Sequence, residues 1–281
     1  MNAPIALCRL DDFATLRFRG ADAGSFLQGQ LSNDLGKVTR GAILRAGLHN
    51  PQGRTLAVLW LAARAGNDIL ALLPRELAEG VTLQLRRYLL RAKLTITNET
   101  GQLPVIGLWQ PGPIAPAEGL WQLDAQRAVS LPAADEAVPH AEPMTREQWR
   151  ALDIARGLPQ VYGATSGEFV AQMLNLDCID AVSFSKGCYT GQEVIARAHY
   201  RGRVKRRMQR FETLSSAPLA PGDSGQLEDG RSFRVVEAVT RADGSSEFLA
   251  VAPMAAGEAG VATGAATLRV RALPLPYQLP E

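Results

Sequence analysis

Cysteine is scarce in this chain of 281 residues. The three cysteines, Cys8, Cys178 and Cys188, are scattered and form no CxxC pair. An odd, scattered set of thiols is not the pattern of a disulfide framework, and it does not supply the tetrahedral ligand set of a structural metal site. We therefore expect a protein of a reducing compartment, the cytoplasm, with no permanently bound metal.

Long apolar runs are also missing. No stretch approaches the roughly 18 apolar residues of a membrane-spanning helix, and the N-terminal MNAPIALCRLDDF has no basic flank ahead of such a run. We therefore expect no membrane association. The net charge of +2 is too small to indicate a nucleic-acid-binding protein, and 46% hydrophobic residues is an ordinary globular composition.

The spacing of apolar residues predicts an α+β fold. In residues 1–100, a strand near Leu16 precedes a short helix within residues 20–36, and three antiparallel strands fill residues 43–73. A helix opened by Pro74 and a final strand at residues 92–99 complete a βαβββαβ order. This order is typical of helices covering one face of a sheet.

Residues 101–281 differ from this first part in how prolines, glycines and apolar residues are spaced. Prolines and glycines interrupt every apolar run in residues 101–143, which predicts short strands and loops. Thr145 and Gln148 then match a capping box at the start of a helix that ends near Gly157. From about Met208 short alternating runs predict a small C-terminal β-barrel or β-sandwich.

One stretch, SKGCYTGQEVIAR at residues 185–197, carries more chemistry than packing requires. Gly191 lies near the start of a predicted helix, so Cys188 lies close to unpaired backbone N–H groups, and Lys186 adds a cation two residues away. Both features favour the thiolate, and we expect Cys188 to be reactive and accessible to solvent. The alternative is that Cys188 is a small buried apolar residue, as many free cysteines are.

The residues around this stretch carry a family resemblance. Residues 174–207, LNLDCIDAVSFSKGCYTGQEVIARAHYRGRVKRR, closely resemble the YgfZ family, whose signature is KGCYxGQE. SFLQGQLSNDL at residues 25–35 and GEFVAQMLNLD at residues 167–177 are also similar to that family. The resemblance therefore covers nearly the whole chain.

This resemblance implies a fold and a function. The fold is a three-domain ring shared with the aminomethyltransferase of the glycine cleavage system. It would consist of a ferredoxin-like α+β domain at residues 1–100, a second α+β domain with the motif at 101–205, and the β-barrel at 206–281. The implied function is a folate-associated accessory protein for assembly or repair of iron-sulfur enzymes, including those that methylthiolate transfer RNA. Its partners would be tetrahydrofolate or a related folate and iron-sulfur assembly proteins or client enzymes.

The resemblance also suggests site residues. Cys188 and Lys186 would carry the chemistry. A second group would bind folate or another anion: Tyr189, Gln192, Glu193, Arg197, Asn175, Asp177, Arg203 and Lys205. We expect Glu193 to pair with Arg197, four residues further along the same helix face.

Acidic residues are absent from residues 35–67, where the aminomethyltransferase carries a catalytic carboxylate. In our alignment, the glutamate that those enzymes place on the pterin corresponds to Ala155. The absent carboxylates argue against the alternative of a tetrahydrofolate-dependent one-carbon transferase. A conventional enzymatic activity is therefore not expected.

Residues 197–210 contain seven Lys and Arg residues and no acid. Such a run is either a solvated surface or a contact for an anion. A folate glutamate tail and RNA phosphates both fit, and an RNA-binding protein is the second alternative function. No RNA-binding motif accompanies the charge.

Overall fold

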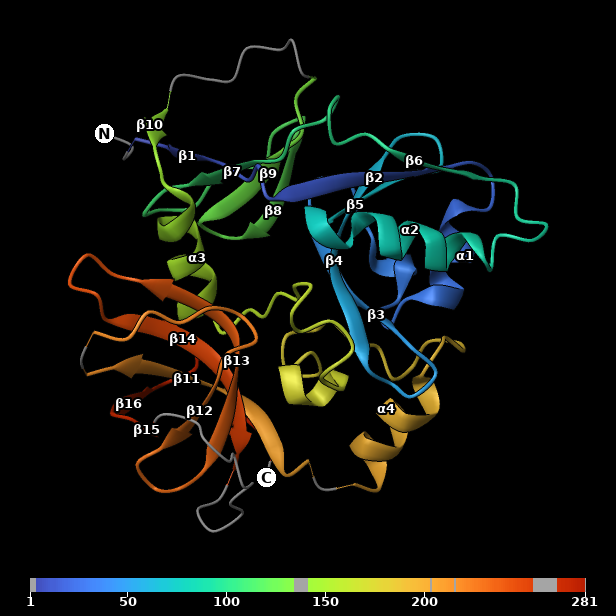
Figure 1. Ribbon diagram of the computed structural model, residues 1–281. Coiled ribbons are helices and arrows are strands. Elements are labelled where there is room, and N and C mark those ends of the chain that lie inside the picture. Colours follow the sequence, from blue (N-terminus) through green and yellow to red (C-terminus); the bar gives the residue numbers. More distant parts are fainter. Residues whose placement is uncertain (1–3, 134–140, 203, 215, 255–266, 281) are drawn as a thin grey trace. The chain divides into compact units, whose positions relative to one another are not determined.

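The computed structural model of this protein describes residues 4–133, 141–202, 204–214, 216–254 and 267–280 (Figure 1). The chain forms two compact units. Unit 1 comprises Met1–Leu48, Ala57–Trp149 and Ser183–Thr190, and unit 2 comprises His49–Leu56, Arg150–Val182 and Gly191–Glu281. Sheets dominate and helices are few, which confirms the α+β class. In the described part of the chain, no helix is long and apolar enough to cross a membrane.

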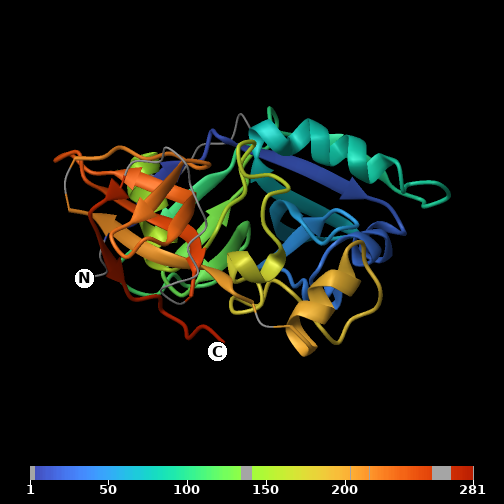
Figure 2. The same ribbon diagram turned by 60° about the horizontal axis from the view of Figure 1, so that its bottom comes forward.

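The first sheet of unit 1 has the strand order β3-β4-β5-β2-β6. Its strands are β3 (Ile43–His49), β4 (Thr55–Arg64), β5 (Asp68–Pro74), β2 (Phe13–Arg19) and β6 (Thr95–Asn98). The helices α1 (Ala23–Gln30) and α2 (Ala78–Arg86) pack on one face, and Figure 2 shows α2 lying along the sheet. Short 3-10 turns, η1 (Leu35–Lys37) and η2 (Arg75–Leu77), follow α1 and precede α2. The predicted βαβββαβ elements are confirmed.

Residues of α1 and α2 form an apolar core with the sheet. Phe26 and Leu27 of α1 meet Leu85 of α2 and the strand residues Phe18 and Leu59. These side chains are at most 8% exposed. The helical spacing of apolar residues gives each helix one apolar face, and the alternation of apolar residues gives the sheet another. These two faces pack against each other.

The second sheet of unit 1 has the order β10-β1-β7-β9-β8. Its strands are β10 (Glu142–Pro143), β1 (Ala6–Arg9), β7 (Ile106–Trp109), β9 (Arg127–Ser130) and β8 (Leu120–Asp124). Sequence spacing indicated no strand before Leu16, yet β1 runs antiparallel to β7 with Cys8 opposite Gly107. A second core joins the two sheets of this unit through Phe13, Trp60 and Trp121.

The helix α3 (Arg146–Ala155) begins with the predicted capping box. The Gln148 backbone N–H donates to the Thr145 hydroxyl at 3.2 Å, and the Thr145 N–H donates to Gln148 Oε1 at 2.8 Å. Trp149, fully buried, packs against Gly107 of β7, where a Cβ would lie only 2.5 Å from the indole.

The sheet of unit 2 has the order β15-β12-β13-β14-β11-β16. Its strands are β15 (Thr267–Leu268), β12 (Ser224–Leu227), β13 (Ser232–Thr240), β14 (Ser246–Pro253), β11 (Arg206–Thr213) and β16 (Val270–Leu273). Unit 2 also contains η3 (Ala171–Leu174) and α4 (Gln192–Tyr200). The predicted closed barrel is corrected to a half-barrel, because the edge strands β15 and β16 pair with β12 and β11 and, over the residues described, not with each other.

Candidate functional site around the KGCY loop

The loop that carries Lys186 and Cys188 is tied to the end of α1. The Ser183 N–H donates to Ser32 O at 2.9 Å. The Lys186 ammonium donates to Gln28 O at 2.5 Å and to Leu31 O at 2.6 Å. Carbonyls at a helix C-terminus lack partners within the helix, and the helix dipole favours a cation there. Lys186 therefore caps α1 and holds the loop in place.

The charge of Lys186 is partly withdrawn from water. Burial lowers the pKa of Lys186 to about 8, and the negative charge of Asp34 acts in the opposite direction. The ammonium lies 4.9 Å from the centre of the Tyr189 ring, a favourable cation–π distance. Burial raises the pKa of Tyr189 to about 12, so this phenol stays neutral. Lys186 and Tyr189 thus anchor the loop from inside unit 1.

Gln28 and Asp34 complete the cluster. Gln28 Nε2 donates to Asp34 Oδ1 at 3.1 Å, and the Leu35 N–H donates to Gln28 Oε1 at 2.7 Å. The backbone N–H of Gly36 and the Gln28 amide hold the pKa of Asp34 below its usual range. Gln28, Asp34, Lys186 and Tyr189 are called the Lys186 cluster below. It joins two family-like stretches, residues 25–35 and 185–193, and sequence reasoning missed Gln28 and Asp34.

Cys188 is exposed at the surface of this loop, as predicted. Cys8 is 1% exposed and its thiol donates to Thr145 O at 3.5 Å. Burial raises the pKa of Cys8 to about 11. Burial and, secondarily, the Asp177 carboxylate raise the pKa of half-buried Cys178 to about 11. Among the described residues, no group of three or more His, Cys, Asp and Glu side chains could hold a metal ion.

The helix start after the motif depends on glycine. Gly191 is the N-cap of α4 with φ +83°, and a Cβ there would lie 2.5 Å from Asn50 O. Gln192 is half-buried, whereas Glu193 and Arg197 are exposed on α4. The predicted Glu193–Arg197 ion pair is wrong: within the part of the chain described, these two side chains form none.

Asn175 and Asp177 lie in a buried network of unit 2. The Arg207 guanidinium donates to Asp177 Oδ1 at 3.0 Å and Oδ2 at 2.9 Å, and also to Gln172 O at 3.0 Å. The Asn175 amide donates to Met208 O at 2.8 Å and lies 3.3 Å from the Tyr277 hydroxyl. The side chains of Arg207 and Asp177 are 4% and 6% exposed. Their polar groups face partners inside the chain.

The basic segment is therefore less uniform than its sequence indicates. Arg210 pairs with Glu247 at 2.6 Å, so acids distant in sequence compensate part of the charge. β11 begins at Arg206, which places Lys205 before the strand, exposed. Arg203 lies outside the described residues. Lys205 and Arg207 are in different environments, because Lys205 precedes β11 and is exposed, whereas Arg207 is buried against Asp177.

Comparison with known proteins gives the relatives of this chain. No model of a known protein family matches it. A protein of Escherichia coli O45:K1 (strain S88 / ExPEC) named "tRNA-modifying protein YgfZ" is 31% identical, over 99% of this chain and 95% of its own length. A protein of the same name from Serratia proteamaculans (strain 568) is 28% identical, over 100% of this chain and 94% of its own length.

The fold has a relative among solved structures. The glycine cleavage system aminomethyltransferase T from Bartonella henselae superposes with a TM-score of 0.68 at 13% identity, covering 90% of this chain and 79% of that protein. This similarity concerns the fold alone. Together with the end-to-end sequence similarity to the E. coli protein, these findings show that the chain belongs to the YgfZ family.

Proposed function

We propose that this protein supports transfer RNA modification as an accessory factor, and that Cys188 is its reactive group. The name of the relatives, "tRNA-modifying protein YgfZ", supports the general role. The more specific role is assembly or repair of iron-sulfur enzymes in the cytoplasm, including those that methylthiolate transfer RNA. The family resemblance of the KGCYTGQE stretch supports it.

The contrast among the three cysteines carries this proposal. Cys188 is exposed, whereas burial raises the pKa values of both Cys8 and Cys178 to about 11. A thiolate is the nucleophile and the metal ligand, so a thiol with a pKa near 11 is largely unreactive at neutral pH. Cys188 is the thiol that a partner protein can reach.

The surroundings of Cys188 favour transient chemistry. No second cysteine lies in the motif, and iron-sulfur clusters require several ligands. One thiol on a fixed loop can act as a transient metal ligand. Its thiolate can also take the outer sulfur of a partner's cysteine persulfide, in which case the S–S bond of the donor breaks and the partner's cysteine leaves as a thiolate. The Lys186 cluster supports this role by fixing the loop while leaving Cys188 exposed.

Replacement of each cysteine tests the proposal. Cys188→Ser should fail to restore iron-sulfur enzyme activity and methylthiolated transfer RNA in a deletion strain, because serine provides no thiolate. Cys8→Ser and Cys178→Ser are the matched controls and should restore both. Iodoacetamide should also modify native Cys188 at least about tenfold faster than the other two thiols, which are shielded and protonated. Full restoration by Cys188→Ser would refute the role.

We propose folate as the small-molecule ligand, on the strength of the family resemblance. Asp177, one of the residues expected to bind folate, is poorly placed to accept from pterin N–H groups, because both of its oxygens already accept from Arg207. Glu193 is an exposed carboxylate within the motif and is the better candidate for accepting pterin N–H groups. No acid occupies residues 35–67, so we derive no one-carbon transfer.

Calorimetric titration with tetrahydrofolate tests this ligand. We expect binding by the wild type and at least about tenfold weaker binding by Glu193→Gln, since a neutral amide is a weaker acceptor than a carboxylate. Glu118→Gln, an exposed carboxylate outside the motif, is the control. Absence of heat with the wild-type protein, or equal affinity in Glu193→Gln, would contradict the respective parts of the proposal.

A further inference from the structure

The loop after α2 combines charge with exposed apolar groups. Residues 86–93, RRYLLRAK, contain four cations and no acid. Leu85 and Leu94 are buried at the two ends, and Leu89 packs against the core, so the loop is anchored. All four cations are exposed, as are Tyr88 at 43% and Leu90 at 92%. This segment is called the cationic loop below.

Leu90 adopts an unfavourable backbone conformation. Its φ is +29°, in the left-handed region that bulky residues rarely occupy. Leu90 gains no packing that would compensate the strain, because it is almost fully exposed. Strain kept at an exposed apolar loop tip points to a function in binding rather than in folding.

Further cations lie at the same end of the first sheet. Strand pairing places Arg64 opposite Asp68, Asp68 opposite Arg19, and Arg19 opposite Thr95, which follows Lys93 closely. Asp68 is already occupied by Arg17, through hydrogen bonds of 2.7 and 3.0 Å. It therefore leaves Arg19 and Arg64 uncompensated.

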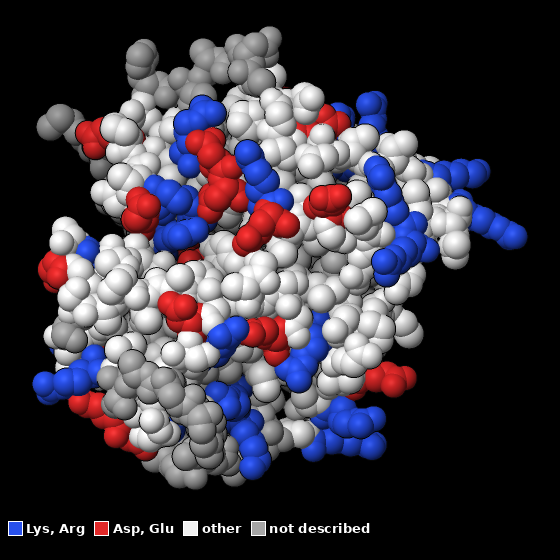
Figure 3. All heavy atoms as spheres, in the orientation of Figure 1, with Lys and Arg blue, Asp and Glu red and all other residues white. Residues whose placement is uncertain are grey.

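Side-chain partners are missing along this edge. In the described part of the chain, the side chains of five cations form no ion pair or hydrogen bond: Arg19, Arg64, Arg87, Arg91 and Lys93. Asp22 Oδ2 accepts from the Lys93 backbone N–H at 2.7 Å. Figure 3 shows Lys and Arg side chains gathered at the right-hand edge of the molecule, where α2 ends.

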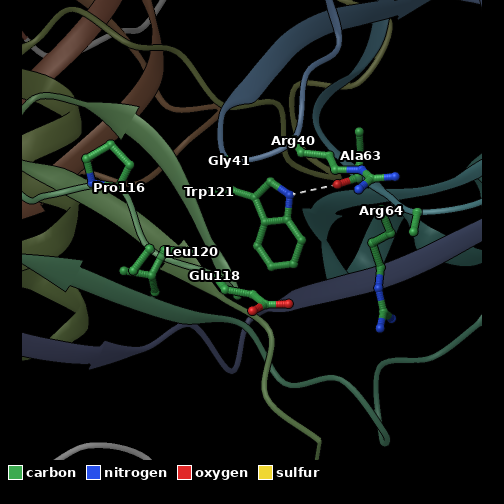
Figure 4. Close-up of a pocket in the computed structure, with 11 residues that line it drawn as sticks. Arg40, Gly41, Ala63, Arg64, Pro116, Glu118, Leu120 and Trp121 are labelled. Carbon is green, nitrogen blue, oxygen red and sulfur yellow. Dashed lines mark hydrogen bonds between the residues drawn. The ribbon is translucent and has the colours of Figure 1, made fainter.

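Arg64 also lines a groove in unit 1. The groove has a volume of about 600 Å³, and Arg40, Arg64, Glu118 and Trp121 are among the residues that line it (Figure 4). The Trp121 indole N–H donates to Ala63 O at 3.0 Å and fixes the wall. Glu118 is the acid that lines this groove.

We propose that the cationic loop and the adjoining edge with Arg19 and Arg64 bind the phosphate backbone of RNA, with Tyr88 stacking on an unpaired base. Guanidinium groups suit phosphate, and Arg19 and Arg64 lie two strands apart in the sheet, about 10 Å from each other at the backbone. Aromatic side chains provide stacking surfaces for single-stranded bases. This inference rests on the proposed role in transfer RNA modification, which makes RNA the relevant polyanion.

An anionic membrane surface is the competing partner. Leu83 is also exposed, at 53%, but the exposed positions of α2 include Glu79 and Arg86 beside it. An interfacial helix needs a broad apolar face, which α2 does not present to solvent. The observations favour RNA.

Fluorescence anisotropy with a labelled, unmodified transfer RNA transcript tests this surface. Arg87→Ser/Arg91→Ser/Lys93→Ser should weaken binding by on the order of 100-fold at 0.1 M salt and reduce the slope of log Kd against log salt by about three. The triple variant Arg9→Ser/Arg75→Ser/Arg269→Ser changes the net charge equally and should change binding little. Leu90→Gly should weaken binding several-fold without lowering the denaturation midpoint, since glycine accepts positive φ.

Several outcomes would overturn the inference. The first is a wild type without measurable affinity for transfer RNA, and the second is an equal loss of RNA affinity in the two triple variants. The third is binding to phosphatidylserine vesicles that is tighter than binding to transfer RNA and that the loop variant abolishes. The deletion-strain assay keeps the two proposals apart. Normal methylthiolation without this protein would refute the proposed function but would leave the measured RNA affinity and its loop dependence standing.

Discussion

Lys186 is subject to opposing effects. Burial disfavours its charge, whereas the carbonyls of Gln28 and Leu31 and the charge of Asp34 favour it. Burial is the larger effect, and the pKa of Lys186 falls to about 8. The folded protein therefore loses this proton at lower pH than the unfolded chain, whose lysines have pKa values near ~10.4.

This difference predicts how stability depends on pH. Between pH 8 and about 10.4 the unfolded chain binds more protons at Lys186 than the folded chain does, so the free energy of unfolding rises with pH in this window. Below pH 8 the contribution of this group is constant. We expect the wild type to gain stability relative to Lys186→Met as pH rises from 8 to 10.

Urea unfolding at several pH values measures this effect. The difference between wild type and Lys186→Met isolates the one titrating group, and Lys205→Met, which removes an exposed lysine, is the control. A difference that falls as pH rises would show that the two carbonyl acceptors outweigh burial and would contradict the prediction.

At the scale of elements, two cations close together at the start of β11 lie in opposite environments. Arg207 is buried in a two-bond contact with Asp177, whereas Lys205 is exposed just before the strand. The same basic run thus contains a buried side chain and an exposed one. Charge alone does not distinguish the two.

Single replacements should separate these roles. Arg207→Ser leaves Asp177 buried without its partner and should lower the free energy of unfolding by about 3–5 kcal/mol. Lys205→Ser should stay within about 0.5 kcal/mol of the wild type. Chemical denaturation provides both values, and a neutral Arg207→Ser would show that the ion pair contributes nothing to stability.

At the scale of the whole molecule, the net charge of +2 hides an uneven distribution. Uncompensated cations gather at one end of the first sheet of unit 1, while cations of β11 pair with acids within unit 2. The similarity to aminomethyltransferase T at 13% identity shows that this α+β arrangement tolerates wide sequence change. A shared fold does not imply a shared activity, and the proposed function depends on the KGCY loop.

Local signals in the sequence determined many elements. α1, the strands β3 to β5 and the capping box of α3 were all predictable, because their apolar spacing and cap residues lie within a few positions of one another. The exposure of Cys188 was also predicted from the motif.

Only the tertiary structure determined which groups the charged side chains contact. Lys186 reaches a carbonyl 155 residues away, and Arg207 neutralises an acid 30 residues away. The pairing of β1 with β7 and the open half-barrel likewise depend on strand order. Helix propensities and caps act over one or two helical turns. The contacts of Lys186 and Arg207 depend instead on how distant segments pack. The spacing of residues along the chain does not reveal this packing.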